Sequence, residues 1–316
     1  MDKNLSILRY ESKYKSQWDE FIHNSINGTF ILNRDYMEYH KDRFKDFSLL
    51  LFSQDELVAL FPANIIDNKV HSHQGLTYGG LILKNNNTNY IMLMYDALIT
   101  FFKNNEIIEV IIRDIPFIYH HSPLATNHYL LFKYGFSLCS RDLSTAIDLN
   151  NFKYKSNRKY SLKKAKTLNL DLAIIESTDY DGFFEILSIL LKEKFNKKPT
   201  HSTNEILKLS KLFSNNISLY LCINNKKDIL AGVVVYKSCK VWHAQYIAST
   251  NSGKECGAGD LIIDYILKKI PNNIPWFDFG ISTTGGGKIL NKDLLSYKES
   301  WGGQPILYDT YKLKIA

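Results

Sequence analysis

Residues 217–236 read ISLYLCINNKKDILAGVVVY, and residues 47–61 read FSLLLFSQDELVALF. In each stretch an apolar run, a polar turn and a second apolar run follow one another, which is the pattern of a β-hairpin. The same pattern therefore occurs once in each half of the chain. This recurrence indicates an internal duplication and sets the frame for the rest of the sequence.

The segments that follow the two hairpins agree in kind and in order. After the first hairpin the patterns predict a third strand with a glycine-containing loop, a helix, a strand, a helix and a last strand, over residues 70–80, 89–102, 109–113, 125–133 and 138–148. After the second hairpin the same elements are predicted at 241–247 with a loop at 252–259, then at 260–269, 276–279, 290–299 and 305–312. We therefore expect an α/β (α+β) fold with mixed sheets in two tandem domains, residues 1–150 and 151–316.

The composition is that of a folded globular protein, with 45% hydrophobic and 22% charged residues among 316. No apolar run approaches the ~20 residues that span a bilayer, and the polar N-terminus has no signal-peptide core. The four cysteines form no CxxC pair, and we interpret them as reduced thiols. We expect a cytoplasmic protein without a transmembrane segment.

The basic charge of the chain is concentrated in one place. Residues 153–166, KYKSNRKYSLKKAK, contain seven basic side chains and no acidic one, and the net charge of the whole chain is +7. The rest of the chain is thus formally neutral, which argues against a protein that coats DNA and favours a local site for an anionic ligand. A solvated linker helix remains the alternative, since the segment is polar nearly all round.

A glycine-rich segment precedes the helix predicted at 260–269. Glycines let the backbone approach a ligand closely, and a helix N-terminus attracts anions. The segment therefore predicts a pyrophosphate cradle, although a plain turn is the alternative. It fits neither the dinucleotide-binding nor the Walker pattern. The predicted cofactor-binding residues are Lys254, Gly257, Ala258 and Gly259.

The most specific motif lies near the C-terminus. Residues 277–282 read FDFGIS, and residues 294–305 read LLSYKESWGGQP. Together they resemble the Fem-type and related GNAT-fold acyltransferases, in which an Asp-Phe-Gly strand end precedes a Phe-Lys-x-x-Phe/Trp-Gly-x-x-Pro motif. The basic run from Ser156 and the Tyr78-Gly79-Gly80 loop also resemble parts of that family, so that the similarity covers nearly the whole chain.

The resemblance implies two GNAT-like domains with the transfer site in the cleft between them. Some relatives use aminoacyl-tRNA to build peptidoglycan bridges, and others use acyl-CoA in polysaccharide pathways. The chain has no long coiled-coil arm at 196–216 and keeps a glycine loop similar to that of the CoA users, with Lys254 at the usual Arg or Gln position. Both features favour acetyl-CoA or another acyl-CoA as the donor, bound by the second domain.

Acyl transfer to an amine requires a neutral amine, aligned reactants and a stabilised oxyanion. Positioning can supply ~7–11 kcal/mol of the barrier, and a general base a further ~10²–10⁴-fold in rate. His243, on the strand that enters the glycine-rich segment, and Asp278, which ends an apolar strand, are the candidate bases. A hydrogen-bonded sheet histidine and a structural carboxylate are the respective alternatives.

The family motif implies roles for several further residues. Lys298 matches the motif lysine, which implies contact with donor phosphate or with the developing oxyanion; by itself it would be an exposed helix lysine. Arg158 and Lys159 are expected to bind substrate phosphates. The remaining expected substrate-binding residues are Tyr78, Gly79, Glu193 and Tyr297, of which Glu193 is also a weaker acid–base candidate.

Two histidine pairs, His71/His73 and His120/His121, are not accompanied by a third ligand at a convincing spacing, so we expect no metal. The leading hypothesis is an acyl-CoA-dependent N-acyltransferase that acts on a nucleotide- or lipid-linked amino sugar in cell-envelope polysaccharide biosynthesis. An aminoacyl-tRNA-dependent transferase acting on a peptidoglycan precursor is the second hypothesis. A non-catalytic binding protein of the same fold is the third. The sequence leaves the oligomeric state open.

Overall fold

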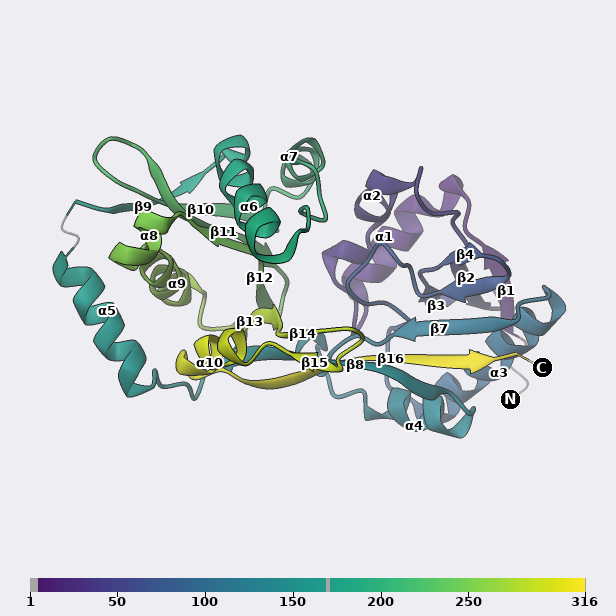
Figure 1. The fold of residues 1–316 in the computed structure, drawn as a ribbon. Coiled ribbons are helices and arrows are strands. Elements are labelled where there is room, and N and C mark those ends of the chain that lie inside the picture. The colour runs from purple at the N-terminus through teal and green to yellow at the C-terminus, as the bar shows by residue number, and fades with distance from the viewer. Residues whose placement is uncertain (1–4, 169–170, 316) are drawn as a thin grey trace. The chain divides into compact units, whose positions relative to one another are not determined.

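The computed structural model describes residues 5–168 and 171–315 (Figure 1). The chain forms two compact units. Unit 1 is built from Met1–Leu143, Thr283–Ile289 and Leu307–Ala316, and unit 2 from Ser144–Ser282 and Leu290–Ile306. Unit 1 therefore includes two segments that the sequence prediction assigned to the second domain.

Unit 1 contains two sheets. The first has the antiparallel order β1-β2-β3-β6, with β1 at Leu5–Arg9, β2 at Leu49–Ser53, β3 at Glu56–Phe61 and β6 at Ile82–Leu83. The second runs in the order β4-β5-β7-β16, with β4 at Asn64–Ile66, β5 at Lys69–His71, β7 at Glu109–Arg113 and β16 at Gln304–Lys314. β5 and β7 are parallel, whereas β7 pairs antiparallel with the C-terminal part of β16.

The helices of unit 1 are α1 at Lys15–Asn24, α2 at Arg34–Met37, α3 at Thr88–Asn104 and α4 at Ala125–Lys133. Helix α3 begins at Asn87, whose side chain accepts a hydrogen bond from the Tyr90 N–H. Its buried residues follow the spacing of a single apolar helix face, and they pack with residues of β2, β3 and β7 in one hydrophobic core.

Unit 2 is organised around one twisted sheet with the order β8-β13-β12-β11-β10-β9. Its strands are β8 at Ser137–Asp148, β9 at Ala173–Ser177, β10 at Ile217–Ile223, β11 at Ile229–Lys237, β12 at Val241–Ser249 and β13 at Trp276–Ile281. β12 and β13 are parallel, whereas β9–β10, β10–β11, β11–β12 and β8–β13 pair antiparallel. Residues 144–148 of β8 belong to this unit, whereas the earlier residues of the strand belong to unit 1.

The helices of unit 2 are α5 at Ser156–Leu168, α6 at Tyr180–Phe195, α7 at Thr203–Leu212, α8 at Asn251–Cys256, α9 at Ala258–Lys269 and α10 at Lys292–Ser300. Alternate residues of β11 point to opposite faces of the sheet. Val233 and Val235 pack in one core with Ile262 and Ile266 of α9, whereas Gly232 leaves room for Phe183 of α6. Helices therefore cover both faces of the sheet.

The structure confirms the mixed α/β fold class and both predicted hairpins, β2–β3 and β10–β11. The structure differs from the predicted elements in three places. The strand and glycine-containing loop predicted at 70–80 are present as β5 and the residues that follow it, but β5 pairs with β4, a strand that was not predicted. Asp67 and Asn68 adopt positive φ in the tight turn that joins β4 to β5.

The loop predicted at 252–259 was also wrong, because residues 251–256 form helix α8. The Thr250 side chain caps this helix by accepting a hydrogen bond from the Gly253 N–H at 3.0 Å. Gly257 then ends the helix in the left-handed conformation, at φ +74°. What the sequence presents as a flexible glycine loop is therefore a pair of helix caps.

The third difference concerns the last strand of each predicted domain. Residues 310–314 of β16 pair with β7 inside unit 1, and residues 144–148 of β8 pair with β13 inside unit 2. Each unit therefore includes a strand segment from the other half of the sequence. Two short strands, β14 at Thr283–Thr284 and β15 at Ile289–Leu290, form a small separate hairpin.

Candidate active site

The candidate site in unit 2 begins where β12 and β13 run side by side. In this parallel pair Val241, Trp242 and His243 lie opposite Trp276, Phe277 and Asp278. The register brings the His243 imidazole next to the Asp278 carboxylate, with 2.9 Å between Nδ1 and Oδ2. The two residues that the sequence offered as separate candidate bases thus form one pair.

The Asp278 carboxylate is completely buried, and both of its oxygens have hydrogen-bond partners. Its Oδ1 accepts hydrogen bonds from the Ser144 hydroxyl at 2.7 Å and from the Gly280 N–H at 2.9 Å, while Oδ2 faces His243. A buried carboxylate with these partners holds the imidazole with its Nδ1–H donating, which leaves Nε2 as the basic nitrogen. The His243 side chain remains 16% exposed, as a general base must be in order to reach substrate.

Lys298 reaches the same place from helix α10. Its side chain is 3% exposed, and Nζ donates hydrogen bonds to the carbonyl oxygens of Gly280 and Ile281 at 2.7 and 2.8 Å. Burial lowers the pKa of Lys298 to about 8, and the nearby Asp278 charge only partly opposes this effect. The lysine is therefore a buried cation at neutral pH that loses its proton far more readily than a surface lysine.

The Gly280 backbone connects Asp278 to Lys298. It has φ +77°, and a Cβ atom there would lie 3.3 Å from His243 Cε1. Its N–H binds Asp278 and its carbonyl binds Lys298. A glycine is required at this position because the turn is left-handed and the imidazole packs against it.

A β-bulge follows His243 in strand β12. Val234 lies opposite Tyr246 and Val235 lies opposite Ala244, so Gln245 is the extra residue. Bulges bend a strand and redirect its side chains, and they are frequent beside active sites. Past the bulge, the Tyr246 hydroxyl is 2.6 Å from His201 Nδ1. The bulge was not predicted from the sequence.

The predicted donor-binding residues lie at the junction of α8 and α9. Lys254 is exposed, and its Nζ donates to the side-chain oxygen of Asn251 at 2.9 Å. The N–H groups of Lys254 and Gly257 donate within α8, to Thr250 and Lys254. Ala258 is fully buried, and a Cβ on Gly259 would lie 2.9 Å from the Ser249 hydroxyl oxygen. Helix α5 covers this junction, since a Cβ on Gly257 would come within 2.9 Å of the Ala165 Cβ.

Arg158 was expected to bind phosphate, but it is buried inside unit 2. Its guanidinium pairs with Asp260 of α9, donates to the Ser300 hydroxyl at 2.8 and 3.0 Å and packs against the rings of Tyr297 and Trp301. The Tyr297 hydroxyl also donates to Asp260, at 3.2 Å. Burial raises the pKa of Asp260, and Arg158 opposes that rise. Arg158 thus ties α5 to α9 and α10.

The remaining predicted residues lie apart from the His243–Asp278 pair or in the other unit. Lys159 and Glu193 are exposed on α5 and α6. In unit 1, the buried Tyr78 hydroxyl lies 3.1 Å from the Thr29 hydroxyl, and the Gly79 N–H donates to Arg113. The structure therefore brings together three predicted residues, namely His243, Asp278 and Lys298.

Ser144 and Gly280 are the parts of the site that sequence reasoning missed. Gly280 belongs to the FDFG motif, so its positive φ could have been inferred from the motif. Ser144 carried no signal, because it reaches Asp278 only through the pairing of β8 with β13. A local pattern does not reveal which distant strand a residue will pair with.

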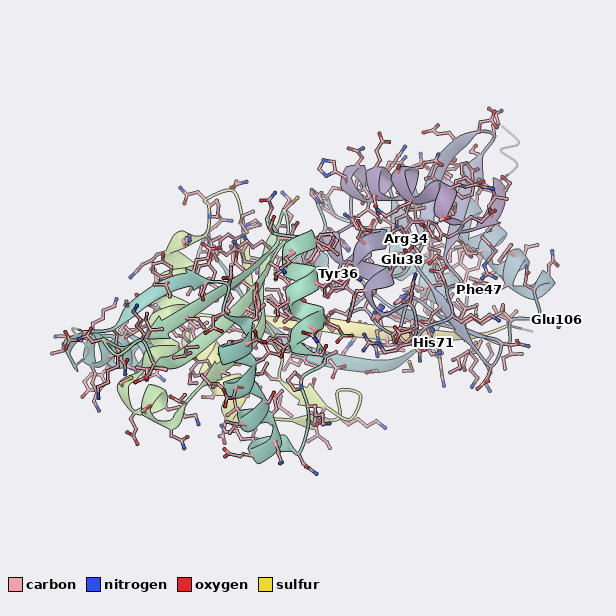
Figure 2. The ribbon with its side chains drawn as sticks, turned by 90° about the horizontal axis from the view of Figure 1, so that it is seen from above. Arg34, Tyr36, Glu38, Phe47, His71 and Glu106 are labelled. Atoms are coloured by element: carbon pink, nitrogen blue, oxygen red, sulfur yellow. The ribbon has the colours of Figure 1, made fainter. Side chains whose placement is uncertain are left out.

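Unit 1 contains a buried arginine, Arg34, whose contacts stabilise the fold. Arg34 of α2 is 3% exposed and forms ion pairs with Asp46 at 2.8 Å and Glu38 at 3.0 Å, while its guanidinium lies 3.6 Å from the Tyr10 ring centre. Arg34 and Glu38 are labelled beside each other in Figure 2. The cluster fixes the short helix α2 and leaves the guanidinium little capacity for a ligand.

His73, one of the histidines considered as a metal ligand, is buried in unit 1. Burial lowers the pKa of His73 to about 3, and its ring stacks on His40 with 5.2 Å between the centres. The neutral imidazole is thus part of an aromatic stack. Over residues 5–168 and 171–315, no group of three or more His, Cys, Asp or Glu side chains could hold a metal ion. In the same part of the chain no helix is long and apolar enough to cross a membrane.

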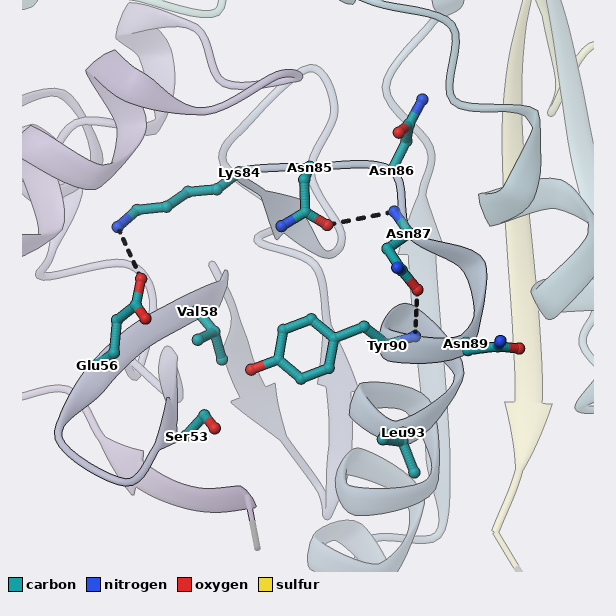
Figure 3. Close-up of a pocket in the computed structure, with 10 residues that line it drawn as sticks. All are labelled: Ser53, Glu56, Val58, Lys84, Asn85, Asn86, Asn87, Asn89, Tyr90 and Leu93. Carbon is teal, nitrogen blue, oxygen red and sulfur yellow. Dashed lines mark hydrogen bonds and ion pairs between the residues drawn. The ribbon is translucent and has the colours of Figure 1, made fainter. Parts of the chain in front are cut away.

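Unit 1 also contains a polar pocket of about 720 Å³ (Figure 3). It lies between Glu56 and Val58 of β3 and the asparagine-rich start of α3. The Asn85 side chain accepts from the Asn87 N–H, and Asn87 in turn caps the helix at Tyr90. None of the predicted site residues lines this pocket.

The architecture of the two units defines a Fem/GNAT-like fold, which confirms the resemblance found in the sequence. Over 98% of its length the chain is similar to the crystal structure of FemX, covering 97% of that chain with 11% identity and a TM-score of 0.70. It is also similar to L-PGS from Bacillus licheniformis, with 10% identity, coverage of 95% and 91% and a TM-score of 0.62. A tandem GNAT protein from the clavulanic acid biosynthesis pathway matches with 8% identity, 99% coverage of both chains and a TM-score of 0.53.

No protein-family model matches the sequence, and no curated protein is significantly similar to it. At identities of 8–11% these structural likenesses establish the fold. Function has to be argued from the site itself.

Proposed function

We propose that the protein is an N-acyltransferase. The observation that carries the proposal is the buried Asp278 carboxylate that binds His243 at Nδ1, which leaves Nε2 as the basic nitrogen of a side chain that is 16% exposed. In this mechanism Nε2 takes a proton from the acceptor amine as its nitrogen attacks the carbonyl carbon of the activated acyl group. The C–N bond forms, the bond to the donor's sulfur or oxygen breaks, and the leaving group receives the proton.

Lys298 supports this reaction in two ways. A buried positive charge stabilises the negative charge that develops on the carbonyl oxygen, and this effect is strong where water is excluded. The two hydrogen bonds from Nζ also fix the turn at Gly280 and Ile281, on which the Asp278–His243 geometry depends. In this proposal unit 2 performs the chemistry, and unit 1 contributes to acceptor binding.

The acceptor we propose is the amino group of a nucleotide- or lipid-linked amino sugar in cell-envelope polysaccharide biosynthesis, and the reaction is cytoplasmic. The C-terminal motif around Lys298 supports this choice, since it resembles transferases of envelope precursors. The donor we propose is acetyl-CoA or another acyl-CoA. The start of α9 supports it, because Gly257 and Gly259 lie at a helix N-terminus, where anions are favoured.

A specific observation favours aminoacyl-tRNA as a second candidate donor. Helix α5 lies against the start of α9 at Gly257, and the first turn of α9 carries the acidic Asp260, which is paired with Arg158. A pyrophosphate at this position would compete with α5 for space and meet a carboxylate. A donor whose phosphates bind elsewhere would avoid both conflicts.

Donor binding tests these two candidates. Titration of the protein with acetyl-CoA and longer acyl-CoAs in a calorimeter, with Gly257→Trp as the control variant, would detect an acyl-CoA site. Micromolar binding that is lost in the variant supports acyl-CoA, provided that the variant unfolds at the same temperature as the wild type. No binding to a stably folded protein, together with amide product from an aminoacyl-tRNA, supports the second candidate. The absence of product with any donor and amine would overturn the proposed activity.

A further inference from the structure

The β-bulge in β12 brings a tyrosine to the face of the sheet that carries the candidate base. In the pairing of β12 with β11, Tyr246 lies opposite Val234 and His243 lies opposite Tyr236. Residues 234 and 236 are two apart on one strand, so their side chains share a face, and so do the side chains of their partners. Without the extra residue Gln245, positions 243 and 246 would point to opposite faces. The bulge therefore places Tyr246 and His243 on one face.

Helix α6 covers the neighbouring part of the same face. The Phe184 ring packs against the Tyr246 ring, with 5.4 Å between the centres and 75° between the planes. Further along, Gly232 of β11 leaves room on this face for Phe183, the neighbouring residue of α6. In the other direction along β12, the His243 side chain is 16% exposed. Tyr246 therefore lies between the part of the face that α6 covers and the candidate base.

The Tyr246 hydroxyl binds the segment that joins α6 to α7, residues 196–202, which we call the α6–α7 loop. Its oxygen accepts a hydrogen bond from the His201 N–H at 3.2 Å and lies 2.6 Å from His201 Nδ1. Burial raises the pKa of Tyr246, so the hydroxyl keeps its proton near neutral pH and can share it with Nδ1. One tyrosine thus binds both the main chain and the side chain of His201.

His201 is the residue that attaches the α6–α7 loop to the sheet. It is 4% exposed and is the only buried residue of the segment 196–202, all of which the structure describes. The loop starts at Asn196, which ends α6 with φ +50°, and it ends at Ser202, whose side chain caps α7 by accepting from the Glu205 N–H. The helices thus fix the two ends of the loop, and the contact with Tyr246 fixes its position on β12.

A loop attached at this point borders the place where the acceptor reacts. The acceptor amine has to come within roughly 2.6–3.2 Å of His243 Nε2 for proton transfer. Apart from the bulged Gln245, Tyr246 is the next residue of β12 on that face, and His201 binds its hydroxyl. An acceptor larger than a simple amine therefore meets the α6–α7 loop on this side of the imidazole.

We infer that the His201–Tyr246 contact holds the α6–α7 loop beside His243, where the loop forms one wall of the binding site for the acceptor. His201 and Tyr246 are then positioning residues, because they order this wall and do not touch the reacting atoms. The inference deepens the proposed N-acyltransferase function and rests on it for its role in the reaction. The attachment of the loop itself can be measured without any acyl transfer.

Hydrogen exchange of the full-length protein tests the attachment of the loop. Tyr246→Phe keeps the ring against Phe184 and removes the hydroxyl. We expect amide exchange over residues 197–202 to rise at least ~10-fold in this variant, while exchange in β10 and β11 stays as in the wild type. His201→Ala should act similarly, and His201→Asn, which keeps a hydrogen-bonding atom near the position of Nδ1, should recover most of the protection. Unchanged exchange over this segment in Tyr246→Phe would overturn the inference.

Tyr220→Phe is the matched control. Tyr220 is a fully buried tyrosine of β10 in the same unit, and its hydroxyl has no hydrogen-bond partner among the described residues. Loop exchange and acyl transfer should stay within about 2-fold of the wild type in this variant. An equal rise in loop exchange in Tyr220→Phe and Tyr246→Phe would show a general loosening of unit 2 and would also overturn the inference.

Kinetics test the positioning role. In Tyr246→Phe we expect KM for the acceptor to rise at least ~10-fold. The single-turnover rate at saturating acceptor should stay within about 3-fold of the wild type, because His243 and Asp278 are unchanged. A fall of ~10²-fold or more in that rate, with an unchanged KM, would show that Tyr246 acts on the reacting atoms and would overturn the positioning role.

The two proposals can fail separately. If the wild type forms amide product and Tyr246→Phe changes neither loop exchange nor KM, the inference fails and the N-acyltransferase proposal stands. If loop exchange rises in Tyr246→Phe and no amide product forms with any donor and amine, the attachment of the loop stands and the proposed activity fails.

Discussion

At the residue scale the proposed active site of unit 2 consists of three side chains and one glycine. His243 and Asp278 belong to neighbouring parallel strands, and Lys298 approaches from α10 to bind the turn at Gly280. Each side chain restricts another, because Asp278 orients the imidazole and Lys298 fixes the turn whose N–H supports Asp278. A change at any one of them should therefore be felt at the others.

The buried Lys298 predicts a particular dependence of stability on pH. Its pKa is about 8 in the folded protein, below the ordinary lysine value. Between pH 8 and roughly 10.4 the unfolded chain binds a proton that the folded chain does not, so stability rises with pH across this window. We expect the free energy of unfolding of the wild type, relative to Lys298→Met, to increase by about 3 kcal/mol from pH 7.5 to 10.5.

Urea unfolding at a series of pH values measures this difference. Lys292→Met, at an exposed position at the start of the same helix, is the control and should show no such trend. A difference between wild type and Lys298→Met that does not change with pH would show that the lysine is not destabilised by burial.

The sequence predicted part of this site. His243, Asp278 and Lys298 were selected from their residue types and from a motif, but the pairing of His243 with Asp278 depends on strand register and was left open. Arg158 was expected to bind a phosphate group. In the structure it connects its own helix, α5, to α9 and α10. A charge run shows where cations are in the sequence, and only the packing shows which of them is buried.

At the element scale Arg158 is the main link between α5 and its neighbours. The pair with Asp260 is mostly buried, with 8% and 17% of the two side chains exposed. Removing one partner of a buried ion pair leaves the other charge without compensation, at a cost of about 3–5 kcal/mol.

We expect Arg158→Met to lower the free energy of unfolding by about 3 kcal/mol near pH 7. Adding Asp260→Asn should recover part of that loss, because the uncompensated carboxylate is removed. Urea unfolding of the two single variants and the double variant gives the coupling between the residues. A loss below about 0.5 kcal/mol in Arg158→Met would contradict the structural role assigned to this pair.

Most helices and strands could be predicted because each shows a local hydrophobic pattern in its own residues. The bounds of β7 and α4 agree with the patterns read from the sequence, and those of α3 differ by one or two residues. The prediction of a loop at 252–259 was wrong because Gly253 and Gly257 are typical of loops in a sequence. In the structure Gly253 lies in the capped first turn of α8, and Gly257 ends that helix in the left-handed conformation. A short helix between two caps has too few residues to show a helical period.

At the scale of the whole molecule the two halves of the sequence are not two self-contained domains. Residues 310–314 complete a sheet of unit 1 next to β7, and residues 144–148 complete the sheet of unit 2 next to β13. Strand pairing between distant segments leaves no local pattern, so the sequence predicted contiguous halves. The duplicated α/β frame itself was predicted correctly, because the two hairpins and their following elements recur in order.

This arrangement predicts the behaviour of a fragment cut at the expected boundary. Residues 1–150 alone lack the strand that pairs with β7 and should expose an unpaired edge and aggregate. The same fragment joined through a flexible linker to residues 304–316 should be monomeric and should unfold cooperatively. Size-exclusion chromatography and thermal unfolding of both fragments check this, and a monomeric, cooperatively folding 1–150 fragment would contradict the assigned strand pairing.

In the proposed reaction the Asp278–His243 pair deprotonates an amine during acyl transfer. The direct measurement is the single-turnover rate of amide formation, followed by mass spectrometry, for the wild type and His243→Gln with the same donor and acceptor. We expect the rate of amide formation to fall ~10²–10⁴-fold in His243→Gln, with the donor dissociation constant within about 2-fold of the wild type. Amide formation at the wild-type rate in this variant would show that His243 is not the base, and would favour another base or a binding protein of this fold.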